Sequence, residues 1–301
     1  MIDAPRPAFL APVGPEERNP WRIGAWLCAA VAAYLLTRDL MVLALTLALP
    51  HAAMEALLAD QAFSGPQRLE LEAILFGCLV AAYLIRGVVL LAFSGNIFRR
   101  PAWTFVTPVR RWAWSLAGQG AAWGALLIAA VLAVDWSLGE PNPAPALDAH
   151  FALQDRAIFA AALAPLALLM VTVQEIVFRG VVLQATSAFI RNRYVVALLN
   201  GVLYALTQRD PTTAAMLEGT LVGAALTWAV LELGGLEFGI GVQFLRLWAA
   251  LMAGPLFTSE IGKKPDWTVS PAEACEIGVT FVAILAGAWL VKRVNRRRLG
   301  L

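Results

Sequence analysis

Long apolar stretches separated by short polar segments are the main pattern along this chain. Eight of them approach or exceed the roughly 20 residues that a helix needs to cross a bilayer. They are residues 23–49, 69–93, 112–135, 157–187, 194–208, 212–232, 234–257 and 272–291. Because lipid offers no hydrogen-bond partner to the backbone, these stretches should be helices. The fifth is short, which suggests an end inside the membrane against protein, and the fourth is long enough to reach into the cytoplasm.

The positions of the basic residues test this map. Most of the 23 Lys and Arg residues lie in the segments 6–22, 99–111, 191–193 and 292–298, which share one side of the membrane if the eight helices alternate in direction. Cytoplasmic segments of membrane proteins carry an excess of Lys and Arg. We therefore predict an all-α integral membrane protein, a bundle of about eight transmembrane helices with both termini in the cytoplasm. The bacterial plasma (inner) membrane is the expected location.

Composition narrows the possible partners. The chain is 60% hydrophobic and 15% charged, whereas soluble domains carry about 25% charged residues. A single soluble core cannot bury so large an apolar surplus, so membrane lipids are expected partners. The net charge of +2 gives no case for nucleic-acid binding.

Segment boundaries follow from the same pattern. Residues 1–21 are rich in proline and lack the basic start and apolar run of a cleavable signal, so we expect a flexible cytoplasmic tail. Residues 22–156 should form an N-terminal three-helix membrane region, residues 157–292 a membrane core that carries the polar motifs, and residues 293–301 a basic cytoplasmic tail. Small residues spaced four apart predict close helix packing at three places, Gly120 and Gly124, Gly219 and Gly223, and Gly235 and Gly239.

Ionisable residues inside the predicted spans are costly in lipid and invite functional hypotheses. Arg38 and Asp39 are adjacent in the first span, so they should point about 100° apart and not face each other well. One interpretation is that the first helix is over-long and places this pair near the outer interface. Another is that Arg38, Asp39 and Arg86 line a polar path. Snorkelling of Arg86 to the cytoplasmic headgroups is a simpler explanation for that residue.

The densest polar cluster lies in the fourth span, where the sequence is Gln174-Glu175-Ile176-Val177-Phe178-Arg179-Gly180. Glu175 and Arg179 are four residues apart with the acid nearer the N-terminus, which favours an intrahelical ion pair. A structural role for this pair is one interpretation. Gln208 ends the fifth span and Gln243 lies in the seventh, and single glutamines in membranes commonly hold helices together by hydrogen bonds.

Taken together, these stretches resemble the CPBP family, also called Abi or CAAX-protease-like, which includes intramembrane prenyl endopeptidases and bacteriocin-processing proteins. The family's first motif, Glu-Glu-x-x-x-Arg, corresponds to residues 174–179. Its second, Phe-x-x-x-His, corresponds to Tyr204 through Gln208. Its third places Gly-x-x-x-Gly before His-x-x-x-Asn, here Gly219 and Gly223 followed by Gln243 through Leu247. The resemblance covers roughly residues 157–257.

The departures from the family pattern carry a chemical consequence. In active members the first Glu is taken to activate water, while the histidines and Asn place the water and stabilise the oxyanion. Here Gln174 replaces that Glu, Gln208 and Gln243 replace the histidines, and Leu247 replaces the Asn; Glu175 and Arg179 are retained. Gln cannot take up a proton near neutral pH, and general-base catalysis needs a group that can.

The motif stretches also contain few side chains that could bind a metal ion. The two histidines of the chain, His51 and His150, lie in predicted outer loops. A zinc site at the motifs would have only scattered carboxylates, so we expect no metal and no other cofactor.

Three functional hypotheses remain open. The first is a non-catalytic protein that keeps the fold and binds a membrane protein or a lipidated peptide. The second is an active intramembrane endopeptidase with a rearranged site around Glu175, although Arg179 beside it works against a basic role. The third is a small transporter or channel-like protein that uses Arg38, Asp39 and Arg86. The resemblance, with its departures at the catalytic positions, favours the first hypothesis, a pseudoenzyme.

Overall fold

A computed structural model describes residues 7–59, 61, 63, 67–106, 112–138, 151–207, 212–253 and 267–299, and these ranges contain helices but no strand. The long helices are α1 (Pro20–Ala48), α3 (Arg68–Ile97), α4 (Trp114–Leu138), α5 (Leu153–Glu175), α8 (Thr213–Leu233), α9 (Glu237–Ala253) and α10 (Pro271–Leu299). Shorter ones are α2 (His51–Leu58), α6 (Leu183–Ser187) and α7 (Arg193–Ala205). The all-helical prediction is confirmed for the described residues.

Six helices of the described chain are long and apolar enough to cross a membrane. They are Pro20–Ala48, Arg68–Ile97, Trp114–Val134, Leu153–Ser187, Thr213–Leu233 and Pro271–Asn295. The apolar helix α7 has 13 residues and α9 has 17, which at about 1.5 Å per residue is short of a full crossing for α7 and marginal for α9. The count of eight spans stays a prediction.

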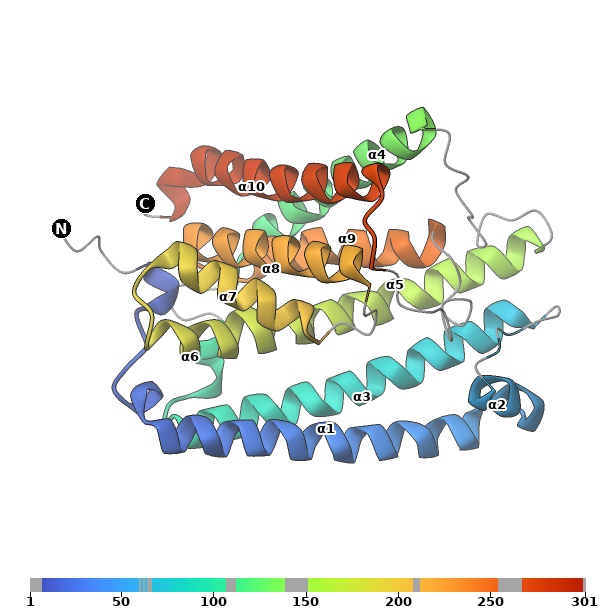
Figure 1. Ribbon diagram of the computed structural model, residues 1–301, viewed down its shortest axis with the longest axis horizontal. Coiled ribbons are helices and arrows are strands. Elements are labelled where there is room, and N and C mark those ends of the chain that lie inside the picture. Colours follow the sequence, from blue (N-terminus) through green and yellow to red (C-terminus); the bar gives the residue numbers. More distant parts are fainter. Residues whose placement is uncertain are drawn as a thin grey trace.

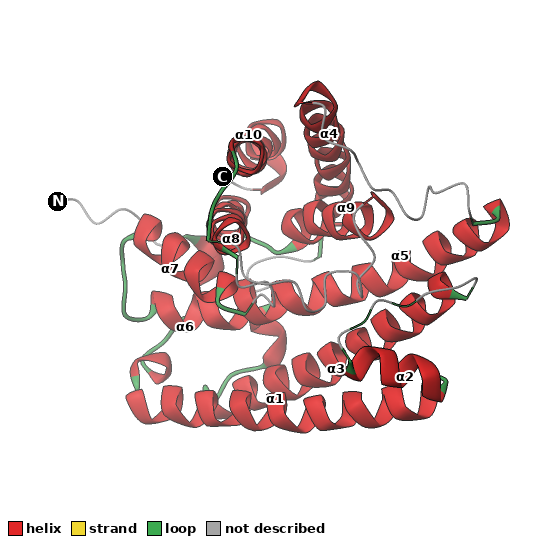
Figure 2. Ribbon diagram, turned by 45° about the vertical axis from the view of Figure 1, so that its right-hand side comes forward, coloured by secondary structure: helices red, strands yellow, loops and turns green. Residues whose placement is uncertain are grey.

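Successive long helices run back and forth through the molecule, and the start of α1 and the end of α10 lie at the same end (Figure 1). Helices α1 and α3 pack together on one side of α5, whereas α4, α8, α9 and α10 lie on the other side (Figure 2). Helices α7 and α8 pack side by side, as do α4 and α9. The cytoplasmic assignment of the two ends remains a prediction.

Close backbone contacts hold two of these helix pairs together. A Cβ added at Gly120 of α4 would overlap the carbonyl oxygen of Phe238, and one at Gly241 of α9 would overlap that of Ala117. A Cβ at Gly201 of α7 would likewise overlap the carbonyl oxygen of Thr220 in α8. Small residues at such interfaces let helix backbones approach where lipid provides no hydrophobic driving force.

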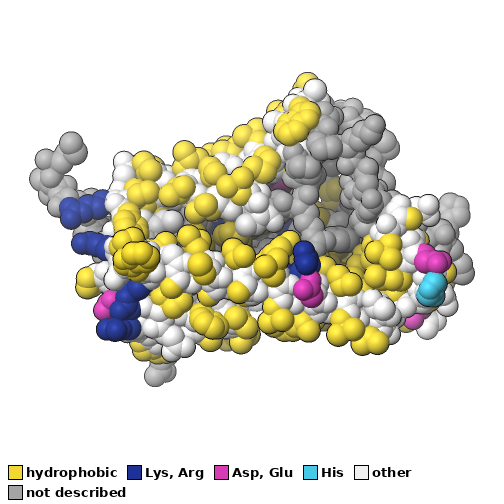
Figure 3. Space-filling view, turned by 60° about the horizontal axis from the view of Figure 1, so that its bottom comes forward, with side chains coloured by type: hydrophobic (Ala, Val, Ile, Leu, Met, Phe, Trp, Pro, Cys, Tyr) yellow, Lys and Arg dark blue, Asp and Glu magenta, His cyan; other side chains and the backbone are white. Residues whose placement is uncertain are grey.

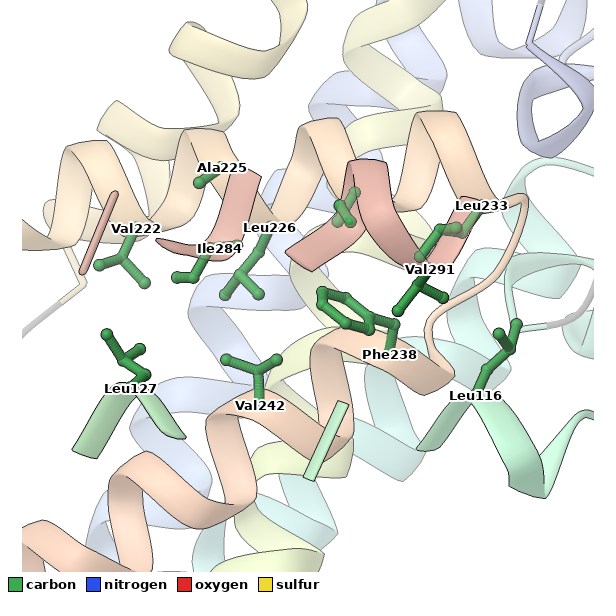
Figure 4. Close-up of a cluster of buried hydrophobic side chains, with 12 residues drawn as sticks. Leu116, Leu127, Val222, Ala225, Leu226, Leu233, Phe238, Val242, Ile284 and Val291 are labelled. Carbon is green, nitrogen blue, oxygen red and sulfur yellow. The ribbon is translucent and has the colours of Figure 1, made fainter. Parts of the chain in front are cut away.

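The largest apolar core lies between α4, α8, α9 and α10. Its buried residues include Leu226 of α8, Phe238 and Val242 of α9 and Ile284 of α10, whose side chains converge in Figure 4. Leu127 completes it from α4. This core fixes α9, and with it Gln243, relative to the rest of the bundle.

The N-terminal segment packs against the helices. Its described residues, from 7 onward, form two 3-10 helices, Ala8–Leu10 and Glu16–Arg18, before α1 begins. Phe9, Leu10 and Val13 are buried in a cluster with residues of α7, α8 and α9. The assignment of residues 1–21 as a flexible cytoplasmic tail stays a prediction, and the described part of this segment packs against an apolar surface of neighbouring helices. At the other end of the chain α10 continues through Leu299 and includes most of the predicted basic tail over residues 293–301.

Buried charge reinforces this N-terminal packing. The carboxylate of Glu17 lies 3.2 Å from the Arg100 guanidinium, which also donates a hydrogen bond of 2.5 Å to Gln184. Burial lowers the pKa of Arg100, and the negative charge of Glu17 acts in the opposite direction. Arg18 donates to the carbonyl oxygen of Ala188. The segment thus ties the end of α3 to α6.

The charged residues of α1 and α3 also depart from expectation. Arg38 and Asp39 do pair, with Nη2 2.9 Å from Oδ1, because the long Arg side chain bends back to its neighbour. Arg86 of α3 donates from Nε and Nη2 to the Thr37 hydroxyl and lies over the rings of Tyr34 and Tyr83. Arg86 is therefore held by α1 instead of reaching alone towards headgroups.

Candidate functional site

The first motif lies where the α-helical winding changes. Helix α5 ends at Glu175, a π-helical segment follows over Ile176–Val182, and α6 begins at Leu183. The Asn200 side chain of α7 donates 3.1 Å to the carbonyl oxygen of Phe178 inside this segment. Asn200 in turn accepts a hydrogen bond of 2.9 Å from Thr227 of α8. π-Helical turns are rare and occur frequently at functional sites.

Glu175 and Arg179 form a completely buried ion pair. Their side chains are 0% exposed, and Arg179 Nη1 lies 3.0 Å from Glu175 Oε1. The Arg179 guanidinium also lies 4.5 Å from the centre of the Tyr204 ring and donates from Nη2 to the Gly223 carbonyl oxygen at 3.4 Å. The pair is thus enclosed by α7 and α8.

Helix α9 closes the remaining side of the carboxylate. A Cβ added at Gly239 would lie 2.7 Å from Glu175 Oε2, so the absent side chain leaves just enough room for this oxygen. Gln243 follows one helical turn after Gly239, about 6 Å along the axis. The third motif is therefore placed directly beside the first.

A chain of polar contacts leads from this pair towards a more exposed side chain. Gln243 donates from Nε2 to the Tyr204 hydroxyl at 3.3 Å and accepts from Arg246 Nη1 at 2.8 Å. Arg246 in turn forms an ion pair with Glu218 at the start of α8, whose side chain is 43% exposed. The chain of contacts thus runs from the buried Arg179 through Tyr204, Gln243 and Arg246 to Glu218 at the surface.

Not every residue proposed from the sequence joins this cluster. The described contacts bring together Glu175, Arg179 and Gln243. Gln174 is partly exposed and takes no part in the chain of contacts. Gln208 lies outside the described residues. Leu247, at the position of the family's Asn, is partly buried against apolar clusters.

Several contributors were not proposed as site residues from the sequence. Tyr204 stands at the first position of its motif and Glu218 lies outside the motif positions, so the motif pattern predicts neither as a site residue. Arg246 was not assigned a role, although its position three residues after Gln243 puts both on one helix face. Asn200, completely buried in α7, is the kind of intramembrane polar residue that could have been flagged.

The chemistry of the cluster is that of hydrogen bonding. It presents an amide, a phenol and a guanidinium, together with carboxylates that are already paired with arginines. The described part of the chain contains no group of three or more His, Cys, Asp or Glu side chains placed to hold a metal ion. His51, at the start of α2, is exposed and pairs with Glu55.

Comparison with known proteins points to one family. Residues 156–258 match the family model described as type II CAAX prenyl endopeptidase Rce1-like. No curated protein matches the chain, and no solved structure does. The matched range runs from α5 to the end of α9 and contains the π-helical segment, the buried ion pair and Gln243. The match supports the CAAX-protease-like (CPBP) family for this domain, and the apolar helices identify the chain as a membrane protein.

Proposed function

We propose that this protein is a catalytically inactive member of its family that binds a lipidated peptide or a membrane protein. The observation that carries the proposal is the state of Glu175, the carboxylate retained from the first motif. Its side chain is 0% exposed and held by Arg179, and Gly239 packs against its other oxygen. At the positions of the family's first Glu, its two histidines and its Asn, this chain has Gln174, Gln208, Gln243 and Leu247.

Amide hydrolysis makes demands that this arrangement does not meet. A general base must come within hydrogen-bond reach of the water that it deprotonates. Water could reach Glu175 only if the contacts with Arg179 or Gly239 opened. Gln174 and Gln243 can orient a water but cannot take its proton. The alternative of a protease rearranged around Glu175 therefore has little support from the geometry.

The polar chain is better suited to binding. Gln243, Tyr204 and Arg246 offer donors and acceptors beside the half-exposed carboxylate of Glu218. Inside a membrane, an unwound segment of peptide needs partners for its backbone groups. A peptide could bind here if its backbone groups replaced the present contacts between these side chains. It would then be bound without being cleaved.

The transporter alternative draws on Arg38, Asp39 and Arg86, which would have to face one continuous path. Arg38 and Asp39 are exposed on the outer side of α1, whereas Arg86 points at Thr37 between α1 and α3. This separation does not favour a shared path.

A binding and cleavage assay tests the proposal. The purified protein in detergent receives a farnesylated CAAX peptide that carries a photoreactive group, or the same peptide without the lipid, with an active family member as a control. We expect lipid-dependent cross-linking and no cleavage product by mass spectrometry. Tyr204→Phe and Gln243→Leu should weaken cross-linking, whereas Tyr194→Phe, an exposed tyrosine of α7, should not.

Two results would overturn the proposal. Cleavage that disappears in a folded Glu175→Gln variant would establish a rearranged protease. Cross-linking that is equally weak with and without the lipid would reject binding of a lipidated peptide. As a converse test, Gln174→Glu, Gln208→His, Gln243→His and Leu247→Asn can be installed together, and activity gained only then would show that the chemistry alone is missing.

A further inference from the structure

Helix α1 is the least covered of the six candidate spanning helices. Its buried residues, Trp26, Ala33, Thr37 and Leu45, lie on one side, which faces α3. The rest of its circumference is exposed along almost the whole length of the helix. Such exposure is expected of an outer helix of a monomer in lipid when the exposed surface is apolar throughout. The exposed surface of α1 is not apolar throughout.

A charged pair interrupts the apolar surface of α1. The side chains of Arg38 and Asp39 are 56% and 68% exposed and form an ion pair with each other. Exposed leucines surround them, namely Leu35, Leu36, Leu40 and Leu43. Helix α1 continues for nine residues beyond Asp39 to Ala48, roughly 14 Å of further apolar helix. Figure 3, which views the α1 side, shows a basic and an acidic side chain standing alone between the charged ends of a largely hydrophobic face.

Asp39 also belongs to a regular stripe on this helix. Seven exposed residues follow alternating steps of three and four, namely Ala25, Cys28, Ala32, Leu35, Asp39, Val42 and Thr46. This spacing is the a/d pattern of a two-helix seam. At about 100° per residue, the stripe is centred opposite the buried side of α1. Its first three members are small, as is typical where membrane helices approach closely.

We propose that a second copy of this chain covers this surface through parallel pairing of the two α1 helices about a two-fold axis along the membrane normal. All copies share one membrane orientation, so their α1 helices are parallel. In such a seam the hole that receives Asp39 is formed by Leu35, Arg38, Asp39 and Val42 of the second copy. Each Asp39 then faces the Arg38 of the other copy.

Charge complementarity favours a second copy of α1, over a different helix, as the partner of this surface. A two-fold contact brings the same patch of both copies together, so the patch must be complementary to itself. Neighbouring opposite charges at one level of the membrane satisfy this condition, and pairing removes both from lipid. This dimer does not depend on the proposed binding function, because the seam lies on α1, outside the family-matched residues 156–258.

Cys28 provides a direct probe of the seam. It is exposed and lies in the stripe, whereas the other exposed cysteine of the described chain, Cys275, lies at the start of α10. Parallel pairing should bring the two Cys28 residues within disulfide reach, a Cα separation below about 7 Å. Mild oxidation of membranes should yield a covalent dimer that Cys28→Ser abolishes and Cys275→Ser does not.

Charge exchange gives the sharper test. Two differently tagged copies are co-expressed, and Cys28 cross-links between them are measured. Arg38→Asp in both copies, or Asp39→Arg in both, should reduce the yield by roughly tenfold or more, because like charges then meet. Arg38→Asp in one copy with Asp39→Arg in the other should restore it. Melting temperature and maleimide labelling of Cys28 verify that each variant is folded and reactive.

Two outcomes would reject the proposal. One is a wild-type protein whose Cys28 reacts with maleimide but does not cross-link between tagged copies, which would assign the surface to lipid or to a different protein. The other concerns Arg38→Asp in one copy and Asp39→Arg in the other. It is a cross-linking yield for this mixed pair that stays as low as when both copies carry the same variant, although both variants are folded. In that case the charges do not meet across a two-fold axis.

Discussion

The ion pair between Glu175 and Arg179 lies in the segment that resembles the first family motif, and its environment makes a structural role for both residues the expected one. Each side chain is completely buried. The aromatic face of Tyr204 and the Gly223 carbonyl oxygen provide the guanidinium with further partners. Loss of either partner would leave a charge in surroundings that cannot solvate it. We therefore expect both residues to be needed for folding.

Substitution of either partner should destabilise the protein more than substitution of both. We expect Glu175→Gln and Arg179→Met each to cost about 3–5 kcal/mol, as is typical when one member of a buried pair is removed. The double variant should be milder than the worse single one because no charge is left unpaired. Thermal melts and the monodisperse yield in detergent measure this order. Normal melting of both single variants would show that the pair is unimportant for folding.

The π-helical segment depends on a neighbouring helix. Asn200 of α7 donates to the Phe178 carbonyl oxygen and is held by Thr227 of α8. Gly180, in the same segment, lies so close to the Phe105 carbonyl oxygen that a Cβ there would approach within 2.5 Å. Contacts from two sides thus accompany the change in helical winding that orients Arg179.

Removal of the Asn200 amide should loosen this segment. Asn200→Leu removes the side-chain donor to the Phe178 carbonyl oxygen, at an expected cost of about 1–3 kcal/mol, while the Thr227 hydroxyl keeps its contact with the Gly223 carbonyl oxygen. Asn96→Leu is the matched control, since that side chain is exposed and bonds only within its own helix. Hydrogen exchange of peptides that cover residues 176–187 should rise in the first variant and not in the second. Equal exchange in both would contradict a supporting role for Asn200.

The contact between α4 and α9 leads to a second prediction about helices. Gly241→Ala would force a methyl group into the Ala117 carbonyl oxygen and the neighbouring backbone. Because backbone cannot move aside cheaply, the melting temperature should fall. Gly278→Ala of α10 meets nothing within 4 Å and should be neutral or slightly stabilising, since Ala is favoured over Gly by about 1 kcal/mol in a helix interior. A smaller loss for Gly241→Ala than for Gly278→Ala would contradict the packing described.

Sequence reasoning located most helices because apolar length is a local property. The stretch 212–232 corresponds to α8 at Thr213–Leu233, and the short stretch 194–208 to α7 at Arg193–Ala205. The contact between Arg246 and Glu218 could not be found this way, because it joins residues on two helices whose relative rotation is set by packing. The same holds for Phe9, whose burial depends on a surface formed by helices more than 150 residues later in the chain.

The N-terminal segment connects the two sides of the molecule. Phe9, Leu10 and Val13 pack into the cluster formed by α7, α8 and α9, while the following residues lead directly into α1 on the far side of α5. Glu17 and Arg18 add polar contacts to Arg100 and to the Ala188 carbonyl oxygen. The family-matched core and the α1–α3 layer are therefore joined by this segment as well as by the packing of α3 on α5.

Phe9→Ala tests this connection. The Phe9 side chain is 0% exposed, and truncation of a buried Phe to Ala typically costs about 3–5 kcal/mol. Because the segment precedes α1 and is anchored by few other apolar side chains, the loss should appear first as local release, with protease cleavage within residues 7–19 at temperatures where the helices stay folded. Trp21→Ala is the matched control, since Trp21 is 86% exposed and its loss should change neither cleavage nor melting. Mass spectrometry of the cleaved fragments locates the opening. Phe9→Ala protein that resists cleavage as well as the control would show that the polar contacts of Glu17 and Arg18 hold the segment in place without the aromatic anchor.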